Sequence, residues 1–282
     1  MDVYIPQNNI NILIETLVLK PDIKDPLAQL IDTFEPISLV EMDSVKLMNR
    51  VDTKFIIGNS QLPELLKMAL KHYRVVEIDG KRIIPYSSIY FDTDDTEMYM
   101  MHHNGKLNRY KIRMRSYIDS GISFLEIKRK NNKGRTSKKR IGITPEQFQS
   151  MTFEEKEQLF VAAKTPYQAL TLKPQIESSF KRITLVDKNL TERVTLDTAL
   201  EYKKMSDGLV KKVEGIVIIE LKQDGAYRSN FKDYLHALSI NCGSLSKYCL
   251  GMVLVNPSLK NNRFKNKIRK ITKITNNNHG TN

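Results

Sequence analysis

Four basic residues at alternate positions give the clearest chemical signal in the sequence. The segment from Asn108 to Ser116 reads Asn-Arg-Tyr-Lys-Ile-Arg-Met-Arg-Ser, with Lys or Arg at positions 109, 111, 113 and 115. Side chains alternate between the two faces of a β-strand, so these cations would share one face and the apolar residues the other. Four unpaired cations are too costly to bury in a dry core. The basic face should therefore line a space that holds water or an anion.

Four further segments repeat this alternation. The residues that would share a charged face are Glu126, Lys128 and Lys130; Lys138 and Arg140; Arg193, Thr195 and Asp197; and Glu220 and Lys222. A single such strand is typical of the solvated face of an antiparallel sheet. Recurrence in five strands favours a barrel whose polar interior collects the charges.

A carboxylate lies among the cations in two of these strands, as Glu126 and as Glu220. Mg²⁺ usually binds one or two carboxylates together with substrate phosphates, and Mn²⁺ takes similar oxygen ligands. The pattern therefore predicts that a polyphosphate chain, or the phosphates of a nucleotide, binds beside Mn²⁺ or Mg²⁺.

The positive charge is concentrated in two stretches. The formal net charge is +13, while residues 106–140 alone carry +11 and residues 258–282 carry +7, so the rest of the chain is net acidic. This distribution predicts a polyanionic partner, which could be nucleic acid, an anionic membrane or polyphosphate. A specific nucleic-acid partner is disfavoured, because the basic strands have few aromatic residues at stacking spacing and the chain has no helix-turn-helix or zinc pattern.

The sequence predicts a cytoplasmic protein. It contains no run of eighteen apolar residues, and its N-terminus lacks a basic stretch followed by an apolar one. The two cysteines, Cys242 and Cys249, do not suffice for a disulfide scaffold, which is typical of a reducing compartment. The basic tail could bring the protein to the inner face of a membrane, through anionic lipid or a membrane-protein partner.

Strands outnumber helices in the predicted elements, which indicates an α+β fold with a large sheet or barrel. Strands are expected at residues 50–57, 86–92, 108–118, 122–130, 136–143, 174–186, 191–198, 200–205 and 214–222, and helices at 62–72, 145–163 and 227–239. We predict an N-terminal extension over residues 1–40, a main domain over 41–256, and a basic tail over 257–282 that is disordered or weakly helical.

Nine short motifs, in order along the chain, resemble the VTC domain, the polyphosphate polymerase domain of vacuolar transporter chaperones and their bacterial relatives. They are Arg50-Val-Asp-Thr-Lys54-Phe, Tyr90-Phe-Asp-Thr-Asp94, Tyr110-Lys-Ile-Arg113-Met-Arg115, Glu126-Ile-Lys128, Lys138-Lys-Arg140, Phe180-Lys-Arg182, Arg193-Val-Thr-Leu-Asp197, Glu220-Leu-Lys222 and Ser246-Lys247-Tyr248. The resemblance covers about residues 40–256. That domain is one of the triphosphate tunnel metalloenzymes, so the resemblance implies a closed antiparallel eight-stranded β tunnel barrel with a basic lumen and flanking helices.

The resemblance also implies roles for individual residues. The positions that match phosphate-gripping cations are Lys54, Arg113, Arg115, Lys128, Lys138, Arg182, Arg193, Lys222 and Lys247. Among these, Arg113, Arg115, Lys222 and Lys247 are expected to contact the nucleotide, and Glu220 and Glu126 to contact the metal. Eukaryotic members have an arginine where this chain has Met100-Met101-His102-His103, so His102 or His103 is its candidate replacement; a turn at a strand end is their other candidate role.

The implied activity is that of a phosphotransferase. A polyphosphate polymerase would transfer the γ-phosphate of ATP to a growing inorganic polyphosphate chain, with Mn²⁺ or Mg²⁺ bound. Two alternatives stay open on the sequence: a metal-dependent tripolyphosphatase or nucleoside triphosphatase on the same fold, and a polyphosphate-binding module without catalysis.

Overall fold

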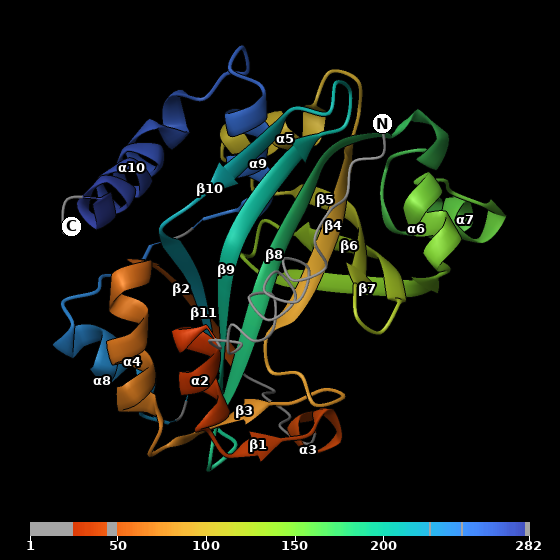
Figure 1. Cartoon of the computed structure of the whole chain (residues 1–282). Helices are drawn as coiled ribbons and strands as arrows, with labels where there is room; N and C mark the ends of the chain where they lie inside the picture. Colours follow the sequence, from red (N-terminus) through yellow and green to blue (C-terminus); the bar gives the residue numbers. More distant parts are fainter. Residues whose placement is uncertain (1–24, 44–49, 226, 244, 280–282) are drawn as a thin grey trace, which may run out of the picture.

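One large, curved sheet organises the protein. The computed structural model describes residues 25–43, 50–225, 227–243 and 245–279. Within these residues, eleven strands form a single mixed sheet, and helices cover both of its faces (Figure 1). The predicted α+β class with a large antiparallel sheet is confirmed.

Eight strands make up the main path of the sheet, and each is antiparallel to its neighbours. In spatial order they are β2 (Arg50–Gly58), β11 (Ile216–Asp224), β9 (Glu192–Lys204), β8 (Lys173–Asp187), β4 (Ile84–Asp92), β5 (Arg109–Tyr117), β6 (Ile122–Lys130) and β7 (Thr136–Ile143). Within the described residues, no hydrogen-bonded ladder joins the end strands β2 and β7. The closed barrel that the sequence predicted is therefore not confirmed. Both end strands carry lysines, and like charges disfavour the close pairing that a ladder requires.

Three short strands lie off this path. The strand β1 (Pro36–Ile37) pairs in parallel with β3 (Tyr73–Val76), which pairs with β8, and β10 (Val210–Val213) pairs with β9. The sequence missed these strands. It also divided β9 in two, because a β-bulge opposite Ser179–Lys181 and the positive φ of Ala199 interrupt its alternation.

Apolar residues at alternate positions bury the convex face of the sheet. Around β2, β11, β9 and the end of β8, this face packs against α2 (Pro26–Asp32), α4 (Leu62–Ala69) and α8 (Asn230–Ala237). Phe55, Leu196 and Ile219 lie in this cluster, whereas their charged neighbours in sequence face the other way. The alternation predicted from the sequence thus decides which face becomes core and which becomes polar.

A second cluster covers the convex face of β4, β5 and β6. It packs under α6 (Pro145–Ser150) and α7 (Glu155–Lys164), which replace the single helix predicted over 145–163. The helix is interrupted between them because Met151 adopts a left-handed conformation, with φ of 59°. Thr144 begins α6 by accepting a hydrogen bond from the Gln147 N–H, and Gln147 caps the Thr144 N–H in return.

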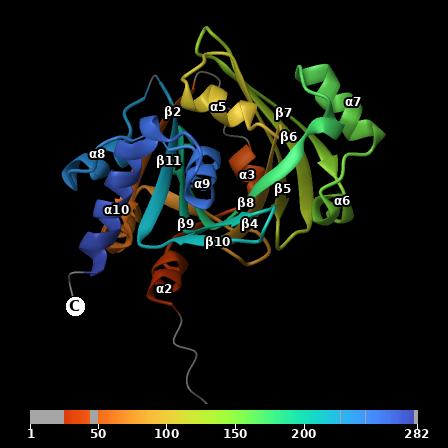
Figure 2. The same ribbon diagram turned by 90° about the horizontal axis from the view of Figure 1, so that it is seen from above.

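The concave face encloses α9 (Lys247–Val255). Seen from above, the sheet curves around this helix (Figure 2). Helix α9 packs on β8 and β9 through a cluster that includes Tyr202 and Ile176, and α5 (Glu97–His103) and α10 (Lys265–His279) contribute to the same cluster. The 3-10 segments η1 (Asn59–Gln61), η2 (Ala169–Thr171) and η3 (Asn262–Phe264), with α3 (Leu39–Asp43), complete the described elements.

Part of the basic tail forms a helix. Residues Lys265–His279 form α10, and Ile271 is only 6% exposed, because isoleucines on one side of the helix pack into the cluster around α9. The lysines on its other side are exposed. Of the predicted N-terminal extension, residues 25–40 supply α2 and β1, and residues 1–24 lie outside the described residues.

A buried carboxylate ties α5 and α9 to the sheet. Asp92, at the end of β4, accepts hydrogen bonds from the backbone N–H groups of Met98 (2.9 Å) and Tyr99 (2.8 Å) and from the hydroxyl of Tyr248. It therefore holds the first turn of each helix in place. No helix in the described residues has both the length and the apolarity that a bilayer span would need.

We predict that Gly251→Ala destabilises the protein although alanine favours helix. A Cβ at Gly251 would lie 2.5 Å from Cδ1 of Ile176 and closer still to the ring of Tyr202, so α9 would have to move away from the sheet. Overpacking of this kind costs about 1–3 kcal/mol. Thermal unfolding should show a lower midpoint for this variant and no loss for Gly142→Ala, whose Cβ would meet no atom within 4 Å. Equal midpoints for both variants would contradict the packing described.

Candidate functional site

The strand register gathers the predicted charged residues on the concave face. Eight of the nine predicted cations lie on strands of the main path with their charged side on this face, and the ninth, Lys247, begins α9. The cross-strand pairs on this face include Arg113 with Glu126, Lys111 with Lys128, Lys128 with Lys138, Arg182 with Asp197, Lys222 with Arg193, and Glu220 with Lys54. Some cations are therefore paired across strands with carboxylates, and others with cations.

The first ion-pair network surrounds Glu126, which is only 1% exposed. One of its oxygens lies 2.6 Å from Nη2 and 2.7 Å from Nε of Arg113, and the other pairs with Lys138. Arg115 lies 3.9 Å away. Burial alone would raise the pKa of Glu126, but these cations outweigh it and lower that pKa to about 2. Glu126 therefore stays ionised and fixes the Arg113 guanidinium.

The second network surrounds Asp197. Arg182 donates two parallel hydrogen bonds to it, from Nε (2.6 Å) and Nη2 (2.8 Å), and Lys247 pairs with the same carboxylate. These cations overcome the effect of burial and hold the pKa of Asp197 well below its usual range. The Arg182 guanidinium also lies over the rings of Tyr86 (5.0 Å) and Phe180 (5.2 Å), which orients it further.

The third pair joins Glu220 to Lys54. Lys222 and Lys54 lower the pKa of Glu220 against the effect of burial. For Lys222 itself, loss of hydration is the main cause of a pKa lowered to about 8, and Arg193 adds to the effect. Arg193 lies toward α3, where its Nη1 is 3.6 Å from Sδ of Met42.

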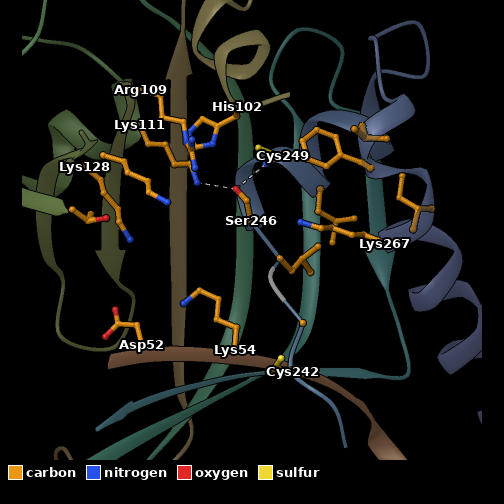
Figure 3. A pocket seen from close by; sticks show the side chains of 18 of the residues that line it. Asp52, Lys54, His102, Arg109, Lys111, Lys128, Cys242, Ser246, Cys249 and Lys267 are labelled. Carbon is orange, nitrogen blue, oxygen red and sulfur yellow. Dashed lines mark hydrogen bonds between the residues drawn. The ribbon is translucent and has the colours of Figure 1, made fainter. Parts of the chain in front are cut away.

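A cavity of about 700 Å³ opens next to these networks (Figure 3). Of the predicted cations, Lys54 and Lys128 line it, together with four the prediction did not select: Arg109, Lys111, Lys130 and Lys267. Loss of hydration, with a smaller contribution from Lys128 and Arg113, lowers the pKa of Lys111 to about 8. Neither Lys111 nor Lys128 forms an ion pair with a described residue, and the six Lys and Arg side chains of the lining face a single lining carboxylate, Asp52. An anionic ligand would balance the excess positive charge of this cavity.

The N-terminus of α9 points into this cavity. Ser246 caps the helix by accepting a hydrogen bond from the Cys249 N–H, and its hydroxyl also accepts one from Lys111, 2.9 Å away (Figure 3). The positive end of the helix dipole adds to the field of the lysines. Ser246 and Lys247 therefore join the cavity to the Asp197 network through a single turn of helix.

The described residues do not form a metal site made of several protein ligands. Among them, no group of three His, Cys, Asp or Glu residues is close enough to hold an ion. A metal that is carried mainly by phosphate oxygens needs only one or two carboxylates. Glu220 fits that need better than Glu126, because its side chain is 23% exposed and pairs with one lysine, whereas Glu126 is buried among Arg113, Lys138 and Arg115.

The histidine pair divides into two different environments. His102 lines the cavity, whereas His103 is 2% exposed, packs against Phe264 and accepts a hydrogen bond from the Arg263 N–H. Both belong to the last turn of α5, a helix that the sequence did not predict. Of the two candidates for a replacement of the tunnel arginine, only His102 can reach a ligand in the cavity.

Comparison with protein families matches residues 49–256 to the VTC domain. The chain belongs to the VTC domain family. This result confirms the resemblance carried by the nine sequence motifs. A search of curated proteins found no match.

Comparison with solved structures finds, among others, three proteins described as putative adenylate or adenylyl cyclases. The cyclase from Bacillus halodurans has 14% identity and a TM-score of 0.48, over 71% of this chain and 96% of its own. The one from Vibrio parahaemolyticus has 15% identity and a TM-score of 0.41, over 71% and 97%. A putative adenylyl cyclase from Hippeastrum, described as having a dominant triphosphatase activity, has 15% identity and a TM-score of 0.49, over 75% and 97%. Similarity this distant carries no information on activity.

We predict that Glu126→Gln lowers the free energy of unfolding and that an inorganic anion restores it. The variant removes the negative charge that neutralises Arg113, Arg115 and Lys138, and breaking a buried pair costs about 3–5 kcal/mol. Thermal unfolding with and without tripolyphosphate should show a larger stabilisation by the anion in the variant than in the wild type. The substitution Glu214→Gln, at an exposed position between β10 and β11, serves as control and should behave as wild type. Equal stabilisation in all three proteins would show that Glu126 does not balance this cluster.

Proposed function

We propose that this protein is a polyphosphate polymerase, which transfers the γ-phosphate of ATP to the end of an inorganic polyphosphate chain. The observation that carries the proposal is the cavity, which is lined by six Lys or Arg side chains and one carboxylate, Asp52, and lies beside two networks that fix Arg113 and Arg182 on the same face. Membership of the VTC domain family supports it. The substrates would be ATP and polyphosphate, and we propose a cytoplasmic location, with the exposed lysines of α10 available to an anionic membrane or a membrane-protein partner.

The fixed arginines would bind the phosphates that react. Guanidinium groups bind phosphate oxygens in pairs, whereas lysines act as point charges. Glu126 and Asp197 hold Arg113 and Arg182 in position before substrate binds, so little reorganisation is needed when charge moves during the reaction. Arg115 and Lys247 lie in the same networks, and Lys54, Lys111 and Lys128 would bind the phosphates in the adjoining cavity.

The reaction needs positioning more than acid–base chemistry. The terminal oxygen of the polyphosphate chain attacks the γ-phosphorus of ATP, the bond from that phosphorus to the β,γ-bridging oxygen breaks, and ADP leaves with the electron pair. Because the attacking oxygen is already ionised, no side chain has to remove a proton. A Mn²⁺ or Mg²⁺ ion held by the phosphates and Glu220 would supply Lewis-acid stabilisation of the transferred group.

We predict that the purified protein, given ATP and Mn²⁺, forms a ladder of phosphate chains together with ADP. Gel electrophoresis and phosphorus NMR would detect both products. Lys111→Ala combined with Lys128→Ala should lose the ladder, because both side chains enter the cavity. The matched control is Arg129→Ala combined with Lys139→Ala, which removes the same charge from exposed positions on the other face of β6 and β7 and should keep activity.

Other products would assign a different reaction. Free orthophosphate without a ladder would replace the polymerase with a triphosphatase. Tight tripolyphosphate binding without turnover would replace it with a binding module. Equal loss of product in the cavity variant and its matched control would mean that overall charge, and not the cavity, explains activity.

We predict that tripolyphosphate affinity weakens as pH rises through about 8. Lys111 has a lowered pKa in the free protein, and a bound polyanion favours its charged form, so binding above that pH requires proton uptake. Linkage then allows up to about tenfold weaker binding for each pH unit. The arginine of Lys111→Arg stays charged over this range. Calorimetry between pH 6.5 and 9.5, in about unit steps, would give the tripolyphosphate affinity of both proteins. The affinity of the variant divided by that of wild type should rise above pH 8. A constant ratio would contradict this role of Lys111.

A further inference from the structure

The two sides of the cavity differ in chemistry. One side is basic and comes from β2, β5 and β6, as described above (Figure 3). The opposite side comes from α9, η3, α10 and the residues just before α9. Its apolar lining side chains are Leu245, Leu250, Val253, Phe264 and Ile268, and Ser246 and Lys267 line the same side (Figure 3). An inorganic phosphate chain gains nothing from such an apolar wall, whereas an uncharged, flat ring would bury apolar surface against it.

His102 adds a hydrogen-bond acceptor without a partner to the lining of the same cavity. Its ring hydrogen-bonds the backbone of Tyr110, and its Nε2 is buried without a partner among the described residues. An imidazole whose Nδ1–H donates to a carbonyl presents Nε2 as an acceptor. Burial, with Lys111 and Arg109 nearby, lowers the pKa of His102 to about 2, so the ring stays neutral.

A neutral acceptor selects a ligand group that donates a hydrogen bond. Ionised phosphate oxygens only accept, and the surrounding lysines and Arg109 favour the ionised form of any phosphate in the cavity. Ribose hydroxyl groups, in contrast, donate. A ligand that satisfies this cavity therefore has a polyanionic end, an apolar ring and hydroxyl donors between them. The volume of about 700 Å³ lies within the range of small-molecule sites, which is about 300–1,000 Å³.

We infer that the side of the cavity formed by α5, α9 and α10 binds the nucleoside of a nucleoside triphosphate, with the base on the apolar wall and a ribose hydroxyl donating to Nε2 of His102. This inference rests on the proposed function, because it takes the basic side of the cavity to hold the phosphates. It adds a specificity-determining role for His102 and for the apolar wall. Both would raise the affinity for ATP and leave the affinity for inorganic tripolyphosphate unchanged.

The test compares two ligands in calorimetric titrations with Mn²⁺. His102→Leu removes the acceptor and Ile268→Ser makes the wall polar. Each should weaken ATP binding by about two- to tenfold, the scale of one hydrogen bond or of part of an apolar side chain. Tripolyphosphate binding should change less than about twofold, which also reports that the variant is folded.

Two matched variants sharpen the result. His102→Gln keeps an acceptor and should retain more of the ATP affinity than His102→Leu. Ile274→Ser makes the same change one and a half turns further along α10, at a half-buried position that does not line the cavity, and should leave ATP binding unchanged relative to tripolyphosphate. On the ligand side, wild type should prefer ATP to 2′,3′-dideoxy-ATP, and His102→Leu should lose that preference.

The outcomes separate this inference from the proposed function. If the variants weaken ATP and tripolyphosphate equally, or if wild type binds ATP and dideoxy-ATP equally, the nucleoside does not bind here although the basic cavity still binds phosphates. If wild type binds neither ATP nor tripolyphosphate, the proposed function fails, and the inference fails with it.

Discussion

Repulsion between cations on the concave face is the constraint on which the structure depends. Bringing so many Lys and Arg side chains into one partly buried region costs free energy, because each loses hydration and approaches like charges. Three carboxylates offset this cost, each at a different point: Glu126 between β5 and β7, Asp197 between β8 and α9, and Glu220 between β11 and β2. They neutralise Arg113, Arg182 and Lys54, whereas Lys111 and Lys128 in the cavity have lowered pKa values. The fold is therefore arranged so that an anionic ligand completes its charge balance.

The hydrophobic packing and the charged face come from the same alternation of residues. In β5 and β6 one set of side chains packs under α6 and α7 while the other set faces the cavity, so a shift of register by one residue would exchange core and site. This coupling explains why the sheet can hold a charged interior at all. The apolar clusters on the convex face stabilise the strands independently of the ligand, and the concave face can then retain unbalanced charge. Asp92 extends this support to the helices, since it holds α5 and α9 against the end of β4.

Much of the fold and of the candidate site could be read from the sequence, because alternation within one strand is a local property. Strand β2, the segments β4 to β7, and the charged faces of β9 and β11 were predicted at nearly their observed bounds. Partners across strands could not be predicted, since they depend on register between segments far apart: the pairing of Arg182 with Asp197 spans β8 and β9, and that of Lys54 with Glu220 joins the two ends of the domain. Lys111 carried the same signal as Arg113, but its importance follows from the place where α9 begins. Helix α5 was missed because Asp92, and not a sequence-adjacent cap, satisfies its first N–H groups.

The position of α9 has a consequence for how the protein is made. Strand β2 pairs with β11 and α9 packs on β8 and β9, so the complete site needs segments separated by most of the chain to come together. Contacts of such long range form slowly and late. Ser246 reaches the cavity and Lys247 reaches Asp197 only when α9 is in place, so a nascent chain exposes its basic strands before its site is complete. During that interval the exposed cations would attract polyanions of any kind, because the groups that complete the site are not yet in place.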